Sequence, residues 1–369
     1  MKVSKLVALA AGTVLLVAAC NTGSTGGGGG KVALLLPEKQ TARYEAADKP
    51  FFEAKFKELC PNVELIYNNA GEDATAQQNQ AEAAITAGAK VLVLDPVDGE
   101  AAGKIVTDAA AKGVKVVSYD RLIKGGSKPD YYLSFDNEAV GRLQGQALLD
   151  KLTADGKTNA KIIWINGSPK DNNALLFAKG AHSVLDGKVT ILKEDAMANW
   201  KSEEAQAIMD AAITKYGKDG FDAVYVANDG GAGGVYASMK AGGVDPKTKP
   251  ITGQDAQVDA IQRILTGDQY MTVYKAIQPE AEAAAAVACD LATGKAVPAD
   301  MTGGKVVNNG TVDVPSVLLT PIAVTVDGKV TGTKSVAATV IADKFYGANS
   351  VAQICTADFA AACAAAGIK

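Results

Sequence analysis

Short, continuous apolar runs alternate along the chain with longer segments in which apolar residues recur at helical spacing. In the first third, the runs are rich in Val, Leu and Ile, which is typical of strands buried on both faces of a parallel sheet. Gly88 and Gly113 stand where helix C-caps belong. The pattern predicts strands at residues 32–36, 63–67, 91–94 and 114–119, and helices at 44–59, 74–87 and 100–112.

The same alternation restarts after residue 160. It predicts strands at 161–165, 189–192, 223–227 and 271–274, and helices at 172–185, 202–216, 235–241 and 256–265. An Ala-rich helix at 280–293 and a strand-like segment at 316–326 follow. Two consecutive βα sets predict an α/β fold made of two doubly wound parallel-sheet domains that face each other.

A late helix followed by a late strand implies that the chain crosses back between the two domains. We expect crossings near Asp136, near Ile277 and within residues 308–316, which together would form a three-crossing hinge. The expected domains are residues 31–136 with about 278–310, and residues 137–277 with about 315–345. A Cys-containing tail at 346–369 would follow them.

The N-terminal segment predicts export. Lys2 and Lys5 precede an apolar run at 6–17, which is too short to span a bilayer comfortably and fits a signal peptide. Small residues then precede Cys20, an arrangement typical of a bacterial lipobox, so residues 1–19 would be removed and Cys20 lipidated. The alternative is an ordinary signal peptide with an incidental cysteine. Residues 20–30 are rich in Gly, Ser and Thr and fit a flexible tether.

The net charge of the chain argues against nucleic acid as a partner. The 369-residue chain has 37 basic and 41 acidic residues; without Lys2 and Lys5 it has 35 basic and 41 acidic residues, a net charge of −6. This balance offers no electrostatic footprint for nucleic acid. No other apolar stretch approaches the length of a membrane span. We therefore expect a monomer that is extracytoplasmic and attached to the cell membrane through its lipid alone.

Four cysteines remain after Cys20, and an oxidising compartment favours disulfides between them. Their spacing does not resemble a zinc site, so we expect neither a metal nor a cofactor. Four cysteines allow three pairings, and the sequence does not decide among them. A local loop would pair Cys355 with Cys363, and Cys60 with Cys289 would then join two helices of one domain.

Polar side chains recur where predicted strands end, in both domains. Ligands of open parallel sheets bind beyond the carboxyl ends of the strands. Capping of the following helix is the alternative role for Asp171. Capping alone does not explain why polar residues recur at strand ends in both domains. Carboxylates, amides and cations together suit a sugar, because each hydroxyl both donates and accepts hydrogen bonds. The candidates are Asp120, Arg121, Asp171, Asn173, Asn228, Asp255 and Lys275, with Tyr44 and Trp200 as aromatic planes for the sugar ring.

Several runs through these positions resemble the xylose-binding branch of the type I periplasmic sugar-binding proteins, over about residues 31–326. They are SYDR at 118–121, SFDNE at 134–138, GSPKDNNA at 167–174, GQDA at 253–256, MTVYK at 271–275, VPS at 314–316 and LTPI at 319–322. The resemblance implies hinge closure on a monosaccharide, most readily D-xylose, and delivery to an ABC permease. In the first loop Arg43 and Tyr44 fit the family's Arg–aromatic pair, with Tyr in place of the commoner Trp, so the resemblance adds Arg43 to the expected binding residues.

Other function classes fit less well. A hydrolase triad would need a base, and the single histidine, His182, lies inside a predicted helix. The glycines at 230–234 do not match a dinucleotide fingerprint and indicate close helix packing. A sugar-responsive repressor would carry a DNA-binding segment where this chain carries an export signal. A sugar sensor for a membrane receptor, or a binding protein for glucose, galactose or arabinose, remains open.

Overall fold

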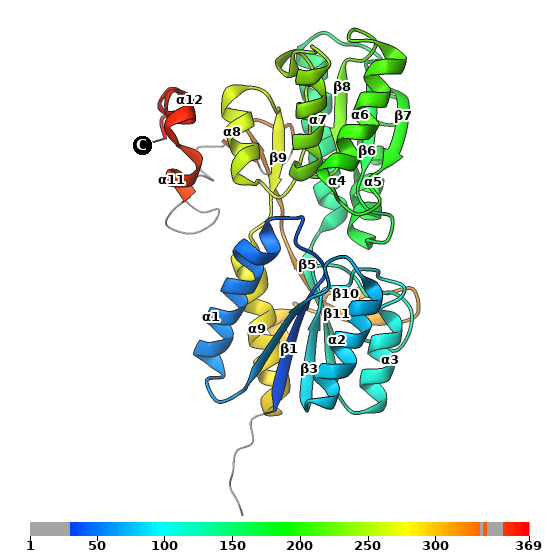
Figure 1. Ribbon diagram of the computed structural model, residues 1–369, viewed down its shortest axis with the longest axis vertical. Helices are drawn as coiled ribbons and strands as arrows, with labels where there is room; N and C mark the ends of the chain where they lie inside the picture. Colours follow the sequence, from blue (N-terminus) through cyan, green and yellow to red (C-terminus); the bar gives the residue numbers. More distant parts are fainter. Residues whose placement is uncertain (1–29, 333–334, 338–349, 369) are drawn as a thin grey trace, which may run out of the picture.

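The computed structural model describes residues 30–332, 335–337 and 350–368, and Figure 1 shows two α/β domains joined by extended crossings. The predicted signal peptide, Cys20 and nearly all of the tether lie outside the described residues, as do residues 338–345 of the expected second domain. Within the described part, no helix is both long enough and apolar enough to cross a membrane.

The first domain is built on a seven-stranded sheet in the order β10-β11-β5-β4-β3-β1-β2. Its described strands pair in parallel except β10 with β11. The central strands are nearly continuous runs of Val and Leu because both of their faces are covered by helices. The strands are β1 (Lys31–Leu36), β2 (Leu65–Asn69), β3 (Ala89–Leu94), β4 (Lys115–Tyr119), β5 (Tyr131–Phe135), β10 (Val306–Asn308) and β11 (Asp313–Leu319).

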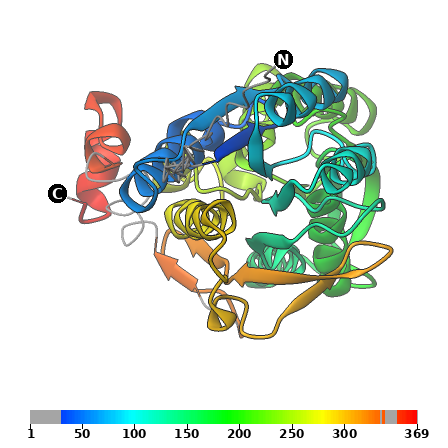
Figure 2. The same ribbon diagram turned by 90° about the horizontal axis from the view of Figure 1, so that it is seen from below.

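Alternate residues of this sheet pack into two separate cores. Val32 and Leu34 contact one core with α1 (Lys49–Leu59) and α9 (Ile277–Thr293). Ala33 and Leu35 contact the other, with α2 (Ala74–Thr86) and α3 (Gly103–Ala111). Figure 2 shows these helices on the two sides of the sheet. A π-helical turn, η1 (Tyr44–Asp48), leads from β1 into α1, and η3 (Ala299–Met301) follows α9.

The second domain has two three-stranded pieces, β7-β6-β8 and β13-β12-β9. Residues 251–255 run between them, since Ile251 pairs with Val224 of β8 and its carbonyl accepts from the Tyr270 amide. The fold class is confirmed, although β12 runs antiparallel to β9. The strands are β6 (Lys161–Asn166), β7 (Thr190–Ala196), β8 (Ala223–Val226), β9 (Met271–Tyr274), β12 (Ile322–Thr325) and β13 (Ser335–Ala337).

The helices of this domain include one that the hydrophobic pattern did not indicate. Helix α4 (Asn137–Ala154) packs so closely on α5 (Asn172–Leu185) that a Cβ at Gly141 would lie 1.9 Å from the Phe177 carbonyl oxygen. Helix α7 (Asp229–Ala241) begins six residues before the predicted start, and one of its glycines, Gly234, packs closely on α6 (Ser202–Tyr216), in line with the predicted close helix packing. The others are α8 (Val258–Thr266) and η2 (Pro246–Thr248).

The third crossing between the domains lies later than predicted. Strand β11 pairs in parallel with β5 of the first sheet, so the chain leaves that domain only after Leu319, at Thr320 and Pro321. The expected crossing within residues 308–316, and with it the division at residues 310 and 315, is therefore wrong. The physical reason is that β11 has the same half-buried pattern that a strand of the other sheet would have, so local sequence does not identify its partner.

Both disulfides are present, in the pairing that local closure favoured. Cys60 at the end of α1 joins Cys289 of α9, with a Cα–Cα distance of 5.9 Å. Cys355 joins Cys363 across the C-terminal segment, which contains α11 (Ser350–Ile354), η4 (Ala357–Phe359) and α12 (Ala360–Ala365). Ile354 of this segment packs against Ile261 and Ile264 of α8, so the tail belongs to the second domain.

Candidate functional site

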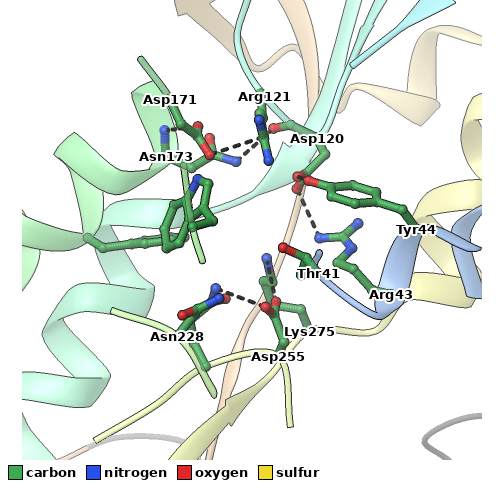
Figure 3. A pocket seen from close by; sticks show the side chains of 13 residues that line it. Thr41, Arg43, Tyr44, Asp120, Arg121, Asp171, Asn173, Asn228, Asp255 and Lys275 are labelled. Atoms are coloured by element: carbon green, nitrogen blue, oxygen red, sulfur yellow. Dashed lines mark hydrogen bonds and ion pairs between the residues drawn. The ribbon is translucent and has the colours of Figure 1, made fainter. Parts of the chain in front are cut away.

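The carboxyl ends of the strands from both domains face one cavity of at most about 280 Å³ (Figure 3). Its lining contains all ten predicted binding residues: Arg43, Tyr44, Asp120, Arg121, Asp171, Asn173, Trp200, Asn228, Asp255 and Lys275. The two domains thus bring together positions more than 200 residues apart in the sequence. That these side chains contact a ligand remains a prediction.

Three lining residues were missed by the sequence analysis, namely Thr41, Phe177 and Gln254. Gln254 could have been found, because it precedes Asp255 in the same strand-end loop. Phe177 lies one helical turn after Asn173 on α5, so it faces the same side. Thr41 lies in the loop after β1, where no periodic pattern indicates which side chain points inward.

Arg43 is held by three carboxylates in the first domain. It donates to Asp48 at 2.6 and 2.9 Å, to Glu280 of α9 at 2.7 Å and to Asp120 at 3.1 Å. Burial lowers the pKa of Arg43, but Asp120, Asp48 and Glu280 outweigh it and raise that pKa above its ordinary value. Arg43 is therefore charged at every physiological pH, and it fixes the Asp120 carboxylate at the cavity wall.

Tyr44 adds a hydroxyl to the same wall, because its Oη donates to Asp120 Oδ2 at 3.3 Å. The Arg43 and Arg121 guanidinium carbons lie 5.4 and 5.6 Å from the centre of its ring. Both distances suit cation–π contacts. The ring is 2% exposed, so it packs between charged groups and leaves only part of its surface for a ligand.

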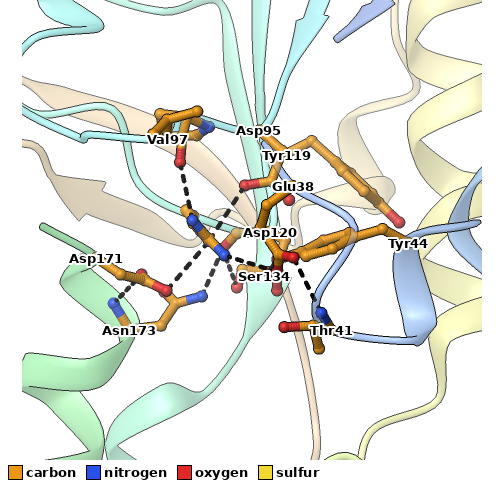
Figure 4. A network of polar contacts seen from close by, with 12 residues as sticks. Glu38, Thr41, Tyr44, Asp95, Val97, Tyr119, Asp120, Ser134, Asp171 and Asn173 are labelled. Atoms are coloured by element: carbon orange, nitrogen blue, oxygen red, sulfur yellow. Dashed lines mark hydrogen bonds and ion pairs between the residues drawn. The ribbon is translucent and has the colours of Figure 1, made fainter. Parts of the chain in front are cut away.

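A second buried network surrounds the Arg121 guanidinium, and Figure 4 labels its carboxylates Glu38, Asp95 and Asp171. The guanidinium nitrogens lie 3.1 Å from Asp171, 3.6 Å from Glu38 and 3.7 Å from Asp95. Asp95 is fully buried, and neither of its oxygens has a hydrogen-bond partner in the described part of the chain. Burial, then Asp120, raises the pKa of Asp95 well above its usual range. The sequence analysis missed Asp95, although it directly follows β3 and so occupies the position that selected the other candidates.

The second domain contributes an ion pair and three side-chain amides, those of Asn173, Asn228 and Gln254. Lys275 Nζ lies 3.0 Å from Asp255 Oδ1, and Gln254 Nε2 donates to Asp255 Oδ2 at 3.1 Å. Asn228 also caps α7, because its Oδ1 accepts from the Gly231 amide at 2.9 Å. The Asp255 carboxylate and the Lys275 ammonium are thus neutralised before any ligand arrives.

Trp200 lies against a position that only glycine can occupy. A Cβ at Gly167 would lie 1.9 Å from Cη2 of the indole ring, so the ring rests on bare backbone. Its edge faces Phe177, with 6.5 Å between ring centroids. Trp200 is 6% exposed and lines the cavity, as a stacking platform for an apolar sugar face requires.

Left-handed backbone conformations concentrate at this site. Asp120, Trp200 and Asp255 have φ angles of 50°, 60° and 97°. Such angles are uncommon for residues other than glycine and cost of order 1–3 kcal/mol each. Three lining residues are therefore held in a conformation that the surrounding packing imposes, which is typical of functional sites.

Direct contacts close the cleft between the two domains. Asn173 Nδ2 donates to the Asp120 carbonyl at 3.1 Å, and the Gly99 amide donates to the Lys170 carbonyl at 3.1 Å. At the rim, Lys201 lies 3.6 Å from Glu72. The structure is a closed form, in which a ligand would touch both domains at once.

Four buried polar atoms of the lining have no hydrogen-bond partner among the described residues: Arg121 Nε, Trp200 Nε1, Gln254 Oε1 and Asp255 Oδ1, of which the first and the last lie in ion pairs. Two donors and two acceptors fit a neutral ligand that has several hydroxyls. In the described part of the chain, no group of three or more His, Cys, Asp and Glu side chains is arranged to hold a metal ion. His182 is not in the lining; it pairs with Asp186 and Glu194 and stacks on Trp164.

A family model described as "Periplasmic binding protein domain" matches residues 32–296. The chain belongs to the periplasmic binding protein family. It is 35% identical over 326 residues to the D-xylose-binding periplasmic protein of Haemophilus influenzae, covering 87% of this chain and 92% of the relative. It is 38% identical over 299 residues to the protein of the same name from Escherichia coli, covering 80% and 86%.

A solved structure extends the similarity to the fold. An ABC transporter solute-binding protein from Clostridium phytofermentans, with bound β-D-glucose, superposes with a TM-score of 0.72 at 31% identity, covering 79% of this chain and 93% of that one. The resemblance seen in the sequence is therefore confirmed at the level of the family and of the two-domain fold. Periplasmic binding proteins act outside the cytoplasm, and the extracytoplasmic location of this member follows.

Proposed function

We propose that this chain binds one monosaccharide, with a preference for D-xylose over other aldoses, and delivers it to an ABC-type permease. The observation that carries the proposal is the closed cavity between the domains, lined by carboxylates, cations and amides from both. The relatives at 35–38% identity are named for D-xylose. The alternatives are glucose, galactose or arabinose, since the solved relative holds β-D-glucose.

The charges of the lining favour a neutral ligand. Each lining cation already has a carboxylate partner: Arg43 with Asp120, Arg121 with Asp171, and Lys275 with Asp255. A charged ligand would have to break one of these buried pairs, which costs about 3–5 kcal/mol. Sugar hydroxyls can bond to both members of a pair without removing either charge.

The size of the cavity supports a single sugar ring. The empty space between the lining residues is at most about 280 Å³ even with open solvent included, which is below the roughly 300–1,000 Å³ usual for small-molecule sites. An oligosaccharide would need the cleft to stay open. Trp200 would stack on the apolar face of the ring, and Asp120, Arg121, Asn173, Asn228, Asp255 and Lys275 would bond its hydroxyls.

Binding would act through the hinge. An open form exchanges with the closed form, and the sugar favours closure because only then do Asp120 and Asp255 reach the same molecule. The closed form would be the one that the permease recognises. A sensor that reports the sugar to a membrane receptor would use the same site, and the presence of a permease gene beside this one would favour transport.

The lipid anchor is part of the proposal. The small residues before Cys20 support lipidation, which would keep a monomeric binding protein close to its permease. Replacing Cys20 with Ser should move the protein from the membrane fraction to the soluble extracytoplasmic fraction. Retention of the Cys20→Ser protein in the membrane fraction would exclude the anchor, without bearing on the sugar site.

A panel of aldoses tests the ligand. The purified protein without its N-terminal 20 residues is heated alone and with D-xylose, D-glucose, D-galactose, L-arabinose or D-ribose. All sugars are used at one concentration; a sugar for which this concentration is about 100 times Kd should stabilise the folded form by about 2.7 kcal/mol and raise Tm accordingly, and weaker ligands should give smaller shifts. A shift with D-xylose that exceeds all others supports the proposal. A larger shift with another aldose would keep the site and change the ligand, and no shift with any would refute sugar binding.

A further inference from the structure

Asp229 does not line the cavity, yet its carboxyl group joins the loops that do. It is fully buried at the start of α7, directly after Asn228. Its Oδ1 accepts from Gln269 Nε2 at 2.8 Å. Its Oδ2 accepts from the Gln257 amide at 2.9 Å and from Thr272 Oγ1 at 2.8 Å. One side chain therefore has three donors from two segments of the chain, one at residue 257 and the other at residues 269–272.

Each of these contacts reaches a segment that carries a lining residue. Gln257 lies two positions after Asp255, and Thr272 lies in β9, three positions before Lys275. The Asp229 amide in addition donates to the Gln254 carbonyl at 3.0 Å. Asp229 thus bonds to the loop of Gln254 and Asp255 at both ends and ties that loop to β9.

The loop that Asp229 holds has a strained backbone. Asp255 and the following residue, Ala256, have φ angles of 97° and 49°. Positive φ angles at two consecutive non-glycine residues are unfavourable unless neighbouring contacts enforce this backbone conformation. The Ala256 amide donates to Thr272 Oγ1 at 3.1 Å, and that same hydroxyl donates to Asp229. Without Asp229 these contacts lose their common anchor.

Glycine at position 253 allows this arrangement. A Cβ on Gly253 would lie 2.0 Å from Asp229 Oδ1 and 2.5 Å from Gln269 Nε2. The loop backbone therefore passes directly over the carboxyl group. Arg263 completes the surroundings, because its Nη2 donates to the Asp229 carbonyl at 3.0 Å and its Nε to Gln269 Oε1 at 2.9 Å. The orientation of Gln269 toward Asp229 is thereby fixed.

We infer that Asp229 is a positioning residue: it holds the Gly253–Gln257 loop so that the Asp255 carboxylate points into the cavity. This inference rests on the proposed function, since the consequence for binding is a loss of sugar affinity without loss of any contacting group. Asp229→Ala removes every acceptor and should weaken D-xylose binding by roughly tenfold or more. Asp229→Asn keeps an acceptor for the Gln257 amide and should recover part of that loss.

A double-mutant cycle distinguishes positioning from general damage. In an Asp255→Asn background, Asp229→Ala should cost less than about threefold, because residues that act through one another are not additive. Phe221→Leu is the control, since Phe221 is a buried residue just before β8, at the opposite end of that strand from Asn228. It should lower Tm and leave affinity unchanged. Full additivity of Asp229→Ala and Asp255→Asn would overturn the inference.

Hydrogen exchange provides a readout that needs no sugar. In Asp229→Ala the Gln257 amide loses its acceptor and should exchange roughly tenfold faster or more, relative to core amides of the same domain. Unchanged exchange would overturn the inference, whatever the affinity. If Asp229→Ala does not fold, Thr272→Val is the second variant, because it removes one of the three donors to Asp229. Hydrogen exchange of the Ala256 amide should accelerate in Thr272→Val by a similar factor. A wild-type protein that binds no sugar would refute the proposed function alone, and exchange would still decide this inference.

Discussion

Arg121 of the first domain and Asp171 of the second lie 3.1 Å apart, Nε to Oδ2, with only 6% and 4% of their side chains exposed. The pair crosses the cleft next to the cavity. Asp171 also caps α5 by accepting from the Asn173 amide at 2.8 Å, so the second domain offers this carboxylate in a fixed position. Closure of the two domains is therefore coupled to the burial of a charge pair that faces the ligand.

Removing Asp171 should weaken sugar binding because the closed form then buries Arg121 with one partner fewer. We expect Asp171→Ala to raise Kd by roughly tenfold or more, measured by calorimetric titration. Asp73→Ala is the matched control, since Asp73 caps α2 through the Thr75 and Ala76 amides and lies away from the cavity. Equal losses in the two variants would indicate that capping, and not closure, accounts for the effect.

Tryptophan fluorescence should report the ligand through Trp200. The chain has two tryptophans; Trp200 lines the cavity, and Trp164 is fully buried in the second domain against Tyr225 and His182. Sugar should change the emission of the wild type and of Trp164→Phe by similar amounts. The change should vanish in Trp200→Phe. A signal that disappears with Trp164 instead would contradict the position of the ligand beside Trp200.

The two disulfides should contribute unequally to stability. Cys60 and Cys289 are separated by 229 residues, and Cys355 and Cys363 by 8. Because the entropy removed from the unfolded chain grows with the enclosed loop, replacing the first pair with Ala should cost about 2–5 kcal/mol of unfolding free energy and the second pair less. Urea denaturation of the two double variants measures both. A larger loss from the Cys355–Cys363 pair would contradict this order.

Asp229 predicts how stability depends on pH. Burial raises the pKa of Asp229 to about 8, although Arg263 and the hydrogen bonds from Gln269 and Thr272 oppose this and Asp255 adds to it. The folded protein then keeps a proton that the unfolded chain loses near its ordinary pKa of about 4. Stability from this group is complete below pH 4 and is lost as the pH rises toward 8, at up to about 1.4 kcal/mol per pH unit.

The comparison that isolates this group is Asp229→Asn, which cannot titrate. Urea denaturation at several pH values between about 5 and 8 should show a steeper decline for the wild type than for the variant. The other charged groups near Asp229, Arg263 and Asp255, are present in both proteins. Parallel declines would show that Asp229 is ionised throughout this range in the folded protein.

Local sequence was sufficient for most strands and for the residues at their ends. The buried strands β1, β3, β4, β6 and β8 are continuous apolar runs, and polar residues that follow such runs must gather at one edge of a parallel sheet. This topological rule alone brings Asp120 and Arg121 to the cavity, and Asn228 and Asp255 opposite them. The same rule applies to Asp95, which directly follows β3 but was not among the predicted residues.

Tertiary contacts determined what the pattern did not show. Helix α4 has glycines at 141 and 145 because it packs tightly on α5; without that context, glycines argue against a helix. The sheet that β11 joins depends on a parallel partner, β5, whose paired residues lie 184 positions earlier in the chain. Residues such as Asp229 do not line the cavity but hydrogen-bond to the loops that do. Their role depends on contacts among three loops, which no spacing in the sequence indicates.

The most direct test is calorimetric titration of D-xylose into the mature, unlipidated protein and into Asp120→Ala. Asp120 accepts from Arg43 and Tyr44 and lines the cavity, so its loss leaves buried donors unpaired. The wild type should bind one sugar per chain, and Asp120→Ala should bind roughly tenfold more weakly or worse. Equal affinity in the two proteins, or no binding of D-xylose or any other aldose to the wild type, would contradict a sugar site between the domains.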